Sequence, residues 1–114
     1  MYEYEVKLPV RKVVDGDTVD LDVDLGFYMT ASIRFRLLGV DTPELRGGTD
    51  DTKKDARIAK EFVESRLGVA DRIMIRTQRA DSFGRWLCDL DYWVGETKFN
   101  LPNEILKAGH GKPA

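Results

Sequence analysis

The stretch TASIRFRLLGVDTPE, residues 30–44, decides the fold of this chain. Its first part alternates apolar and basic side chains: Ile33, Arg34, Phe35, Arg36 and Leu37. That two-residue period predicts a strand over 30–40 with one face in the core. The strand ends abruptly in Asp-Thr-Pro-Glu. Such an ending has two explanations, an ion pair with a helix cap or a site for a metal and a phosphate.

The segments on either side of this strand supply the rest of the fold. Residues 6–14 read as a first strand, and residues 18–25 alternate valine or leucine with acids, which predicts a half-buried second strand. Apolar residues then recur at helical spacing over 49–67, and Gly68 is expected to stop that helix. The remaining elements are expected at 71–78 and 86–93 (strands) and at 100–108 (a short helix).

This order of three strands, a helix, two strands and a helix predicts a small, strongly curved antiparallel sheet. We expect an α+β protein built on a five-stranded β-barrel of the OB-fold type with helices. At 114 residues the chain is expected to form a single domain over 1–114.

Composition limits the function classes. The 18 lysines and arginines are outnumbered by 20 acids, a net charge of −2, which argues against strong passive binding to nucleic acid. A polyanion partner would need a local basic patch or a bound cation. No apolar run approaches the roughly 20 residues of a membrane span, and MYEYEVKLPV lacks the apolar core of a secretory signal, so we expect a cytoplasmic protein with no membrane. Cys88, the only cysteine, fits a reducing compartment.

Acidic residues cluster over 15–24. Asp20, Asp22 and Asp24 alternate with apolar residues, which is typical of the solvent face of a strand. Asp15 and Asp17 differ because they flank Gly16 in the sequence VVDGDTV. They form either a tight Asp-Gly turn or a bend that presents a carboxylate to a cation.

The segment at 41–44 allows two interpretations that can coexist. Thr42 could cap a helical turn with Pro43 in its first position. Alternatively, Asp41 and the Thr42 carbonyl could join Asp17 as oxygen ligands of a hard cation such as Ca²⁺. Glu44 would then lie just outside and hold a water molecule.

Two arginines could bind a phosphate. Arg36 shares a strand face with Arg34, and Arg85 follows a glycine in DSFGR, a hairpin-like turn. Each has a simple explanation, an ion pair for Arg36 and an exposed turn residue for Arg85. Two guanidinium groups converging on one point would instead grip a phosphate, because each offers a planar fork of donors.

Together, VVDGDTV (13–19), FRLLGVDTPE (35–44) and DSFGRWL (81–87) resemble the staphylococcal nuclease, or thermonuclease, family. The resemblance runs from about residue 12 to about residue 112 and implies an OB-type barrel with helices. It also implies that Asp17, Asp41 and the Thr42 carbonyl are ligands of Ca²⁺. Glu44 matches the acid that orients or deprotonates the attacking water.

By the same resemblance, Arg36 and Arg85 bind the scissile phosphate and stabilise its transition state. The implied protein is a monomeric phosphodiesterase that cleaves DNA or RNA, preferably single-stranded, and leaves 3′-phosphate ends. The chain departs from the family at Ser82, where a base is usual, and at Phe83. Without the C-terminal tyrosines of longer members, nucleotide stacking would come from Tyr28, Trp86 or Trp93.

A binding module is the alternative to the enzyme. An OB-type domain can hold single-stranded nucleic acid or a protein partner without cutting anything, and a structural accessory role is also open, because fold alone does not decide function. The presence of all five charged groups, Asp17, Arg36, Asp41, Glu44 and Arg85, favours the nuclease.

Overall fold

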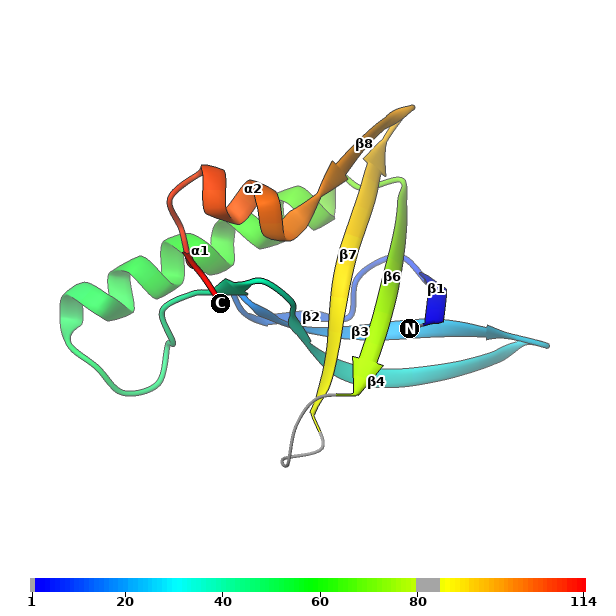
Figure 1. Cartoon of the computed structure of the whole chain (residues 1–114), viewed down its shortest axis with the longest axis horizontal. Coiled ribbons are helices and arrows are strands. Elements are labelled where there is room, and N and C mark those ends of the chain that lie inside the picture. The colour runs from blue at the N-terminus through cyan, green and yellow to red at the C-terminus, as the bar shows by residue number, and fades with distance from the viewer. Residues whose placement is uncertain (1, 80–84) are drawn as a thin grey trace.

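Five strands form a closed ring in the computed structural model, which describes residues 2–79 and 85–114. They are β1 (Tyr2–Val6), β3 (Thr18–Gly26), β4 (Met29–Leu37), β6 (Arg72–Arg79) and β7 (Trp86–Val94). Neighbours around the ring are β1, β6, β7, β4 and β3, and a single pairing of Val6 with Val23 closes β3 onto β1 (Figure 1). The five-stranded barrel of the OB type is therefore confirmed.

Four short strands extend this frame. β2 (Lys12–Asp15) lies beside β3, β8 (Thr97–Asn100) pairs with β7, and β5 (Val40–Asp41) pairs with β9 (Lys112–Pro113). One pairing of the barrel differs from the antiparallel sheet that the sequence predicted, because β4 runs parallel to β7. The helix α1 and strand β6 separate these two strands along the chain, which allows them to enter the sheet in the same direction.

Two predicted strands are wrong in their bounds. The expected strand at 6–14 is two strands, β1 and β2, and residues 7–11 between them contain Pro9, which has no backbone N–H for a ladder. The expected strand at 30–40 ends at Leu37, because the chain turns at Gly39, whose φ of +82° suits glycine. β8 and β9 were not predicted at all.

Both helices lie on one side of the barrel (Figure 1). α1 (Asp50–Gly68) begins after Thr49, whose side chain accepts from the backbone N–H of Thr52, and it buries four small or apolar side chains: Ala56, Ala59, Val63 and Leu67. α2 (Leu101–Lys107) begins after Asn100 and buries Leu101 and Ile105. Both predicted helices are confirmed. Neither has the length and apolar character that a membrane crossing requires, and this holds for the whole described chain.

The interior of the barrel is apolar and closed. Its least exposed side chains come from four of the five strands, and they include Val19, Leu21, Phe35, Leu37, Ile73, Ile75, Leu90 and Tyr92. One polar cluster lies on the outer surface of β6 and β7, where the buried Asp91 carboxylate accepts from Arg76 at 2.7 Å and from Asn100 at 2.9 Å. Burial alone would raise the pKa of Asp91, but these hydrogen bonds lower it below its ordinary value.

Candidate functional site

The turn between β2 and β3 brings Asp17 to the end of β4. The backbone N–H of Leu37 donates to the Asp17 carbonyl at 2.8 Å, so Asp17 is held beside Arg36 by the main chain. The Asp17 side chain is buried, and its carboxylate accepts from the Thr18 hydroxyl at 3.0 Å. Two segments that are about 20 residues apart in the sequence therefore meet at this point.

Gly16 is required here by close packing rather than by its backbone angles. A β-carbon at this position would lie 2.9 Å from Cβ of Ala59 and 2.9 Å from Oγ1 of Thr42. Real atoms do not approach so closely, so only glycine lets α1 and the 41–44 segment press against the turn. The turn is thus anchored from two sides, which the sequence alone did not indicate.

Arg36 joins the two aspartates. Its Nη2 donates to Oδ1 of Asp41 at 2.9 Å and lies 3.7 Å from Oδ2 of Asp17. The Asp17 side chain is 7% exposed and that of Asp41 58%, so the pair reaches from the protein interior to solvent. An acid from the turn and an acid from β5 therefore face the same guanidinium nitrogen.

The segment after Asp41 is not a helical turn, so the predicted helix cap at Thr42 is wrong. Residues 42–49 have no helical structure, and α1 begins only at Asp50. The backbone N–H of Thr42 donates to Oδ2 of Asp17 at 3.1 Å, whereas Oγ1 of Thr42 is buried without a partner among the described residues. Thr42 is thus held through its main chain, pressed against Gly16.

Glu44 lies on the exposed part of this segment. Its carboxylate makes no hydrogen bond or ion pair to any residue in 2–79 or 85–114. The next residue is fixed, because the N–H of Leu45 donates to Oδ1 of Asp15 at 3.4 Å. Asp15 therefore links the turn at residues 15–17, the DGD turn, to the backbone beside Glu44. No sequence pattern predicted this contact.

Arg85 lies directly before the strand that pairs with β4. Arg36 lies opposite Leu87 in the parallel pairing of β4 with β7. Arg85 is two residues before Leu87 and lies just outside β7, which begins at Trp86. Arg85 itself is exposed. Ser82 and Phe83, the two departures from the family pattern, lie outside the described residues.

The donors at this site suit a hard cation. No group of three or more histidine, cysteine, aspartate or glutamate side chains in the described chain could hold a metal. However, Asp17 and Asp41 direct two carboxylate oxygens at one cationic nitrogen, and Ca²⁺ prefers carboxylate and carbonyl oxygens. A positive ion bound by this pair and the Thr42 carbonyl would complete its shell with water and substrate oxygens.

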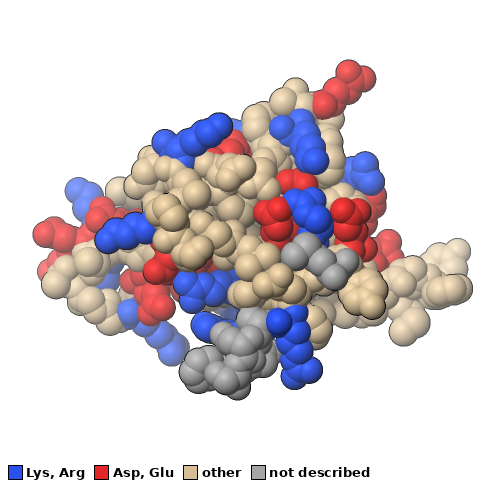
Figure 2. All heavy atoms as spheres, in the orientation of Figure 1, with Lys and Arg blue, Asp and Glu red and all other residues tan. Residues whose placement is uncertain are grey.

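The other strand aspartates are engaged with neighbouring side chains. Asp20 accepts from Arg34 at 2.8 and 3.2 Å, and this hydrogen bond lowers the pKa of Asp20. Asp22 accepts from Ser32 at 2.6 Å. Pairs of this kind leave acidic and basic side chains interspersed over the surface, as Figure 2 shows for one face. The predicted solvent face of β3 is therefore confirmed.

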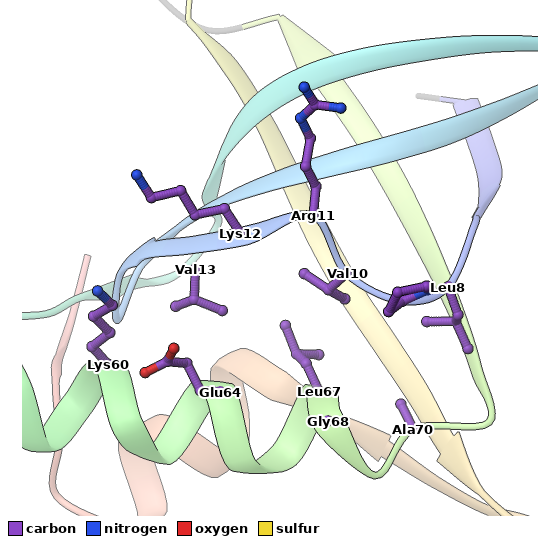
Figure 3. A pocket seen from close by; sticks show the side chains of 11 residues that line it. Leu8, Val10, Arg11, Lys12, Val13, Lys60, Glu64, Leu67, Gly68 and Ala70 are labelled. Carbon is purple, nitrogen blue, oxygen red and sulfur yellow. The ribbon is translucent and has the colours of Figure 1, made fainter.

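Two hollows are lined in part by α1. One of about 570 Å³ is lined by Asp41, Thr42, His110 and Lys112 among others, and its lining includes two of the predicted ligands. The other, of about 650 Å³, lies between β2 and α1, with Lys12, Lys60 and Glu64 along its rim (Figure 3). None of the predicted site residues lines this second hollow. Only Asp41 and Thr42 of the predicted site residues line the first hollow, whereas Asp17, Arg36, Glu44 and Arg85 line neither of the two.

The aromatic candidates for base stacking lie elsewhere. Trp93 is covered by Arg72, whose guanidinium carbon is 5.1 Å from the ring centre, so it is a structural residue. Trp86 is 39% exposed, and Tyr28 is fully exposed at the far end of the β3–β4 hairpin. His110 packs its ring against Phe62, with centres 4.8 Å apart, which is a structural contact.

Comparison with known proteins shows which family the chain resembles in sequence. Residues 34–112 match the family model described as staphylococcal nuclease homologue. The thermonuclease of Staphylococcus intermedius is 32% identical over 102 residues, which cover 88% of this chain and 55% of that protein. An uncharacterized protein of Methanocaldococcus jannaschii is 32% identical over 122 residues, covering 90% of this chain and 56% of that protein. The chain thus spans about half the length of each relative.

Proposed function

Because this chain belongs to the family of staphylococcal nuclease homologues, we propose that it is a calcium-dependent nuclease hydrolysing phosphodiester bonds of DNA or RNA. The observation that carries the proposal is the convergence of Asp17, Arg36 and Asp41 from three separate segments. An ion pair needs only one acid. A second, buried acid beside the same arginine is what a cation and phosphate site needs.

The proposed calcium ligands are the carboxylates of Asp17 and Asp41 and the carbonyl of Thr42. When bound, Ca²⁺ would supply a Lewis acid that offsets the negative charge of a phosphodiester. The protein holds these oxygens in place beforehand. Thr18 and the Thr42 N–H orient the Asp17 carboxylate, and β9 holds the main chain at Asp41 through its pairing with Lys112.

In the proposed reaction, Glu44 accepts a proton from a water molecule. The water oxygen forms a bond to phosphorus, and the bond from phosphorus to the 5′ oxygen breaks. The products are a 3′-phosphate and a 5′-hydroxyl, whose proton comes from solvent water. Glu44 suits this role because it is exposed and makes no bond within the described chain that would compete for its lone pairs.

Arg36 and Arg85 are the proposed phosphate ligands. Their fixed positive charges would oppose the negative charge that grows on the phosphoryl oxygens. Neither is proposed as a proton donor, because a guanidinium does not readily lose a proton. Arg36 donates to Asp41 in the structure, so its fork must exchange that partner for a phosphate oxygen when substrate binds.

The remaining features of the proposal follow from the same site. All five charged groups come from one chain, so a single copy is the proposed catalytic unit and residues 1–114 the proposed domain. We propose single-stranded substrate, because an unpaired strand can bend to bring one phosphate against a site that opens from the barrel wall. The single cysteine, Cys88, is buried, in keeping with the proposed reducing, cytoplasmic location.

The test is cleavage of end-labelled single-stranded DNA and RNA by the purified chain. We expect cleavage with millimolar Ca²⁺, none with a chelator, and new 3′-phosphate ends by mass spectrometry. Arg36→Ala, purified in the same way, controls for contaminating nuclease and should lose at least about 100-fold of the rate. Binding of the oligonucleotide without cleavage, at both low and moderate salt, would overturn the proposal in favour of the non-catalytic module.

A further inference from the structure

The tip of the β3–β4 hairpin is the most unusual surface of the described chain. The hairpin projects from the barrel on the side opposite to the helices (Figure 1). Its tip carries Phe27 and Tyr28, which are 95% and 105% exposed, followed by Met29 at 57%. Large apolar side chains so fully in water are unusual unless something covers them.

The backbone at the tip makes this choice of residues more unusual. Phe27 and Tyr28 both have positive φ, 54° and 62°. A two-residue turn of this kind favours Asn-Gly, because bulky side chains are strained in the left-handed region. Strained positions of this kind are often functional. The geometry of the turn therefore does not explain the two aromatic rings, and we infer that they have a binding role.

An apolar groove lies at the root of the same hairpin. It has a volume of about 580 Å³, and its lining includes Tyr2, Leu25, Ile33 and Trp86. Tyr2 is 73% and Trp86 39% exposed. Among the described lining residues only Arg79 is charged.

The hairpin also has an open edge. Within the described chain, β4 pairs with β7 only from Phe35 to Leu37, so residues 29–34 pair on one side alone, with β3. Unpaired strand edges are templates for pairing with another strand. The edge runs between the aromatic tip and the groove, so all three features belong to one surface.

We propose that this surface binds a second copy of the chain. On β4 the lining of the groove runs from Ala31 to Phe35, which is about 10–24 Å along the strand from Tyr28. Two hairpins placed side by side in opposite directions therefore bring the tip of each beside the groove of the other. Such an arrangement is twofold symmetric and closes on itself, with the aromatic pair of one copy in the groove of its partner.

Charge favours a second copy over nucleic acid at this surface. The charged groups that bond near the tip are Asp24, which accepts from the N–H of Gly26, and Lys7, which donates to Thr30. They balance each other, and the projecting end shows neither acidic nor basic atoms in Figure 2. A nucleic-acid surface would need a basic footprint. A nearly neutral chain, with a net charge of −2, does not repel its own copy.

The exposed apolar area at this surface approaches what a stable dimer buries. An aromatic side chain buries about 150–250 Å² when covered. Phe27, Tyr28, Tyr2 and Trp86, allowing for their partial exposure, together bring about 500 Å² or more per copy, and Leu25 and Met29 add to it. This approaches the roughly 800 Å² per partner of a standard interface. The proposal departs from the monomer expected from sequence and leaves the catalytic groups of each copy in place.

The test is sedimentation velocity of the full chain from about 1 to 500 μM. We expect wild type to shift toward the mass of two chains as concentration rises. The double variant Phe27→Asn with Tyr28→Gly should remain a monomer throughout, because it removes the aromatic tip. It should also keep or raise the melting temperature, since Asn-Gly suits the turn. Misfolding therefore cannot account for the loss of the dimer.

Two further variants complete the test. Tyr2→Lys places a charge in the groove and should weaken the dimer at least 10-fold, whereas Val69→Ser, at an exposed apolar position on the α1 side, should leave it unchanged. A wild type that stays monomeric at 500 μM would overturn the proposal. A tip variant that dimerises like wild type would also overturn it. So would a tip variant that binds oligonucleotides more weakly than wild type but dimerises equally well.

Discussion

Arg36 is the residue on which the site depends. One of its nitrogens lies within ion-pair distance of both Asp17 and Asp41, and its main chain neighbour Leu37 holds the Asp17 carbonyl. The two initial explanations of this segment therefore both apply in part. An ion pair does form, as the simple interpretation expected, but the second, buried acid leaves more negative charge than one guanidinium neutralises.

Glu44 carries the sharpest prediction at the scale of single residues. Glu44→Gln keeps the shape of the side chain and removes the proton acceptor. We expect kcat to fall by about 10²–10⁴ with little change in KM, because general-base catalysis contributes an amount of that order. Steady-state cleavage of a fluorogenic oligonucleotide in Ca²⁺ measures both constants.

The matched control for Glu44 is Glu61→Gln, which changes an exposed acid of α1 in the same way. It should leave kcat at the wild-type value. If Glu44→Gln were as active as Glu61→Gln, Glu44 would not be the base, and the attacking water would have to be activated by another group.

At the scale of elements, the site is an assembly of the DGD turn, the 41–44 segment and helix α1. Gly16 is where the three meet, because a β-carbon there would strike both Ala59 of α1 and Thr42. The helix thus packs against the turn, and Asp15 holds the 41–44 segment by accepting a hydrogen bond from the N–H of Leu45. Packing of this kind fixes the main chain beside Asp17 and Asp41, in addition to the hydrogen bonds that their carboxylates accept.

Gly16→Ala tests this packing. The added methyl group must displace α1 or Thr42, and we expect a loss of about 1–3 kcal/mol in the free energy of unfolding, as in other overpacked sites. Urea denaturation followed by circular dichroism measures the change. The same displacement separates Asp17 from the 41–44 segment, so the calcium concentration needed for half-maximal cleavage should rise.

Gly68→Ala is the control, because Gly68 lies at the end of α1 with no atom within 4 Å of the added methyl group. It should be neutral or stabilise the protein by up to about 1 kcal/mol, the ordinary gain of alanine over glycine in a helix. Equal effects at Gly16 and Gly68 would show that the turn is not supported by α1.

For the whole molecule, the sequence predicted the fold correctly where a strand or helix has a periodic pattern of apolar residues or contains a motif. The alternation in β3 and β4 predicted the barrel strands, and helical spacing located α1 and α2. The break between β1 and β2 was missed because residues 6–14 are rich in valine throughout, although Pro9 marked it. The short strands β5, β8 and β9 could not be predicted, since each exists only through its pairing partner.

The candidate site was likewise predicted only in part from the sequence. The resemblance named the charged residues, but nothing in the sequence indicated that Asp17 is buried, that Arg36 lies between two acids, or that Glu44 is left without a partner in the described chain. Those facts depend on long-range contacts, such as the one between Leu37 and Asp17. The sequence did not predict an exposed aromatic pair at 27–28, because the positive φ angles of both residues are set by the hairpin and leave no pattern in the sequence.

We propose that Asp17, Asp41, Arg36 and Arg85 form one pocket for a cation and a phosphate. A crystal structure with Ca²⁺ and a nucleoside 3′,5′-bisphosphate tests it most directly. We expect an ion bound by both carboxylates and the Thr42 carbonyl, with a phosphate between the two guanidinium groups and Arg36 released from Asp41. Electron density for the nucleotide away from these residues, or an Arg36 that stays on Asp41 with no ion beside it, would contradict it.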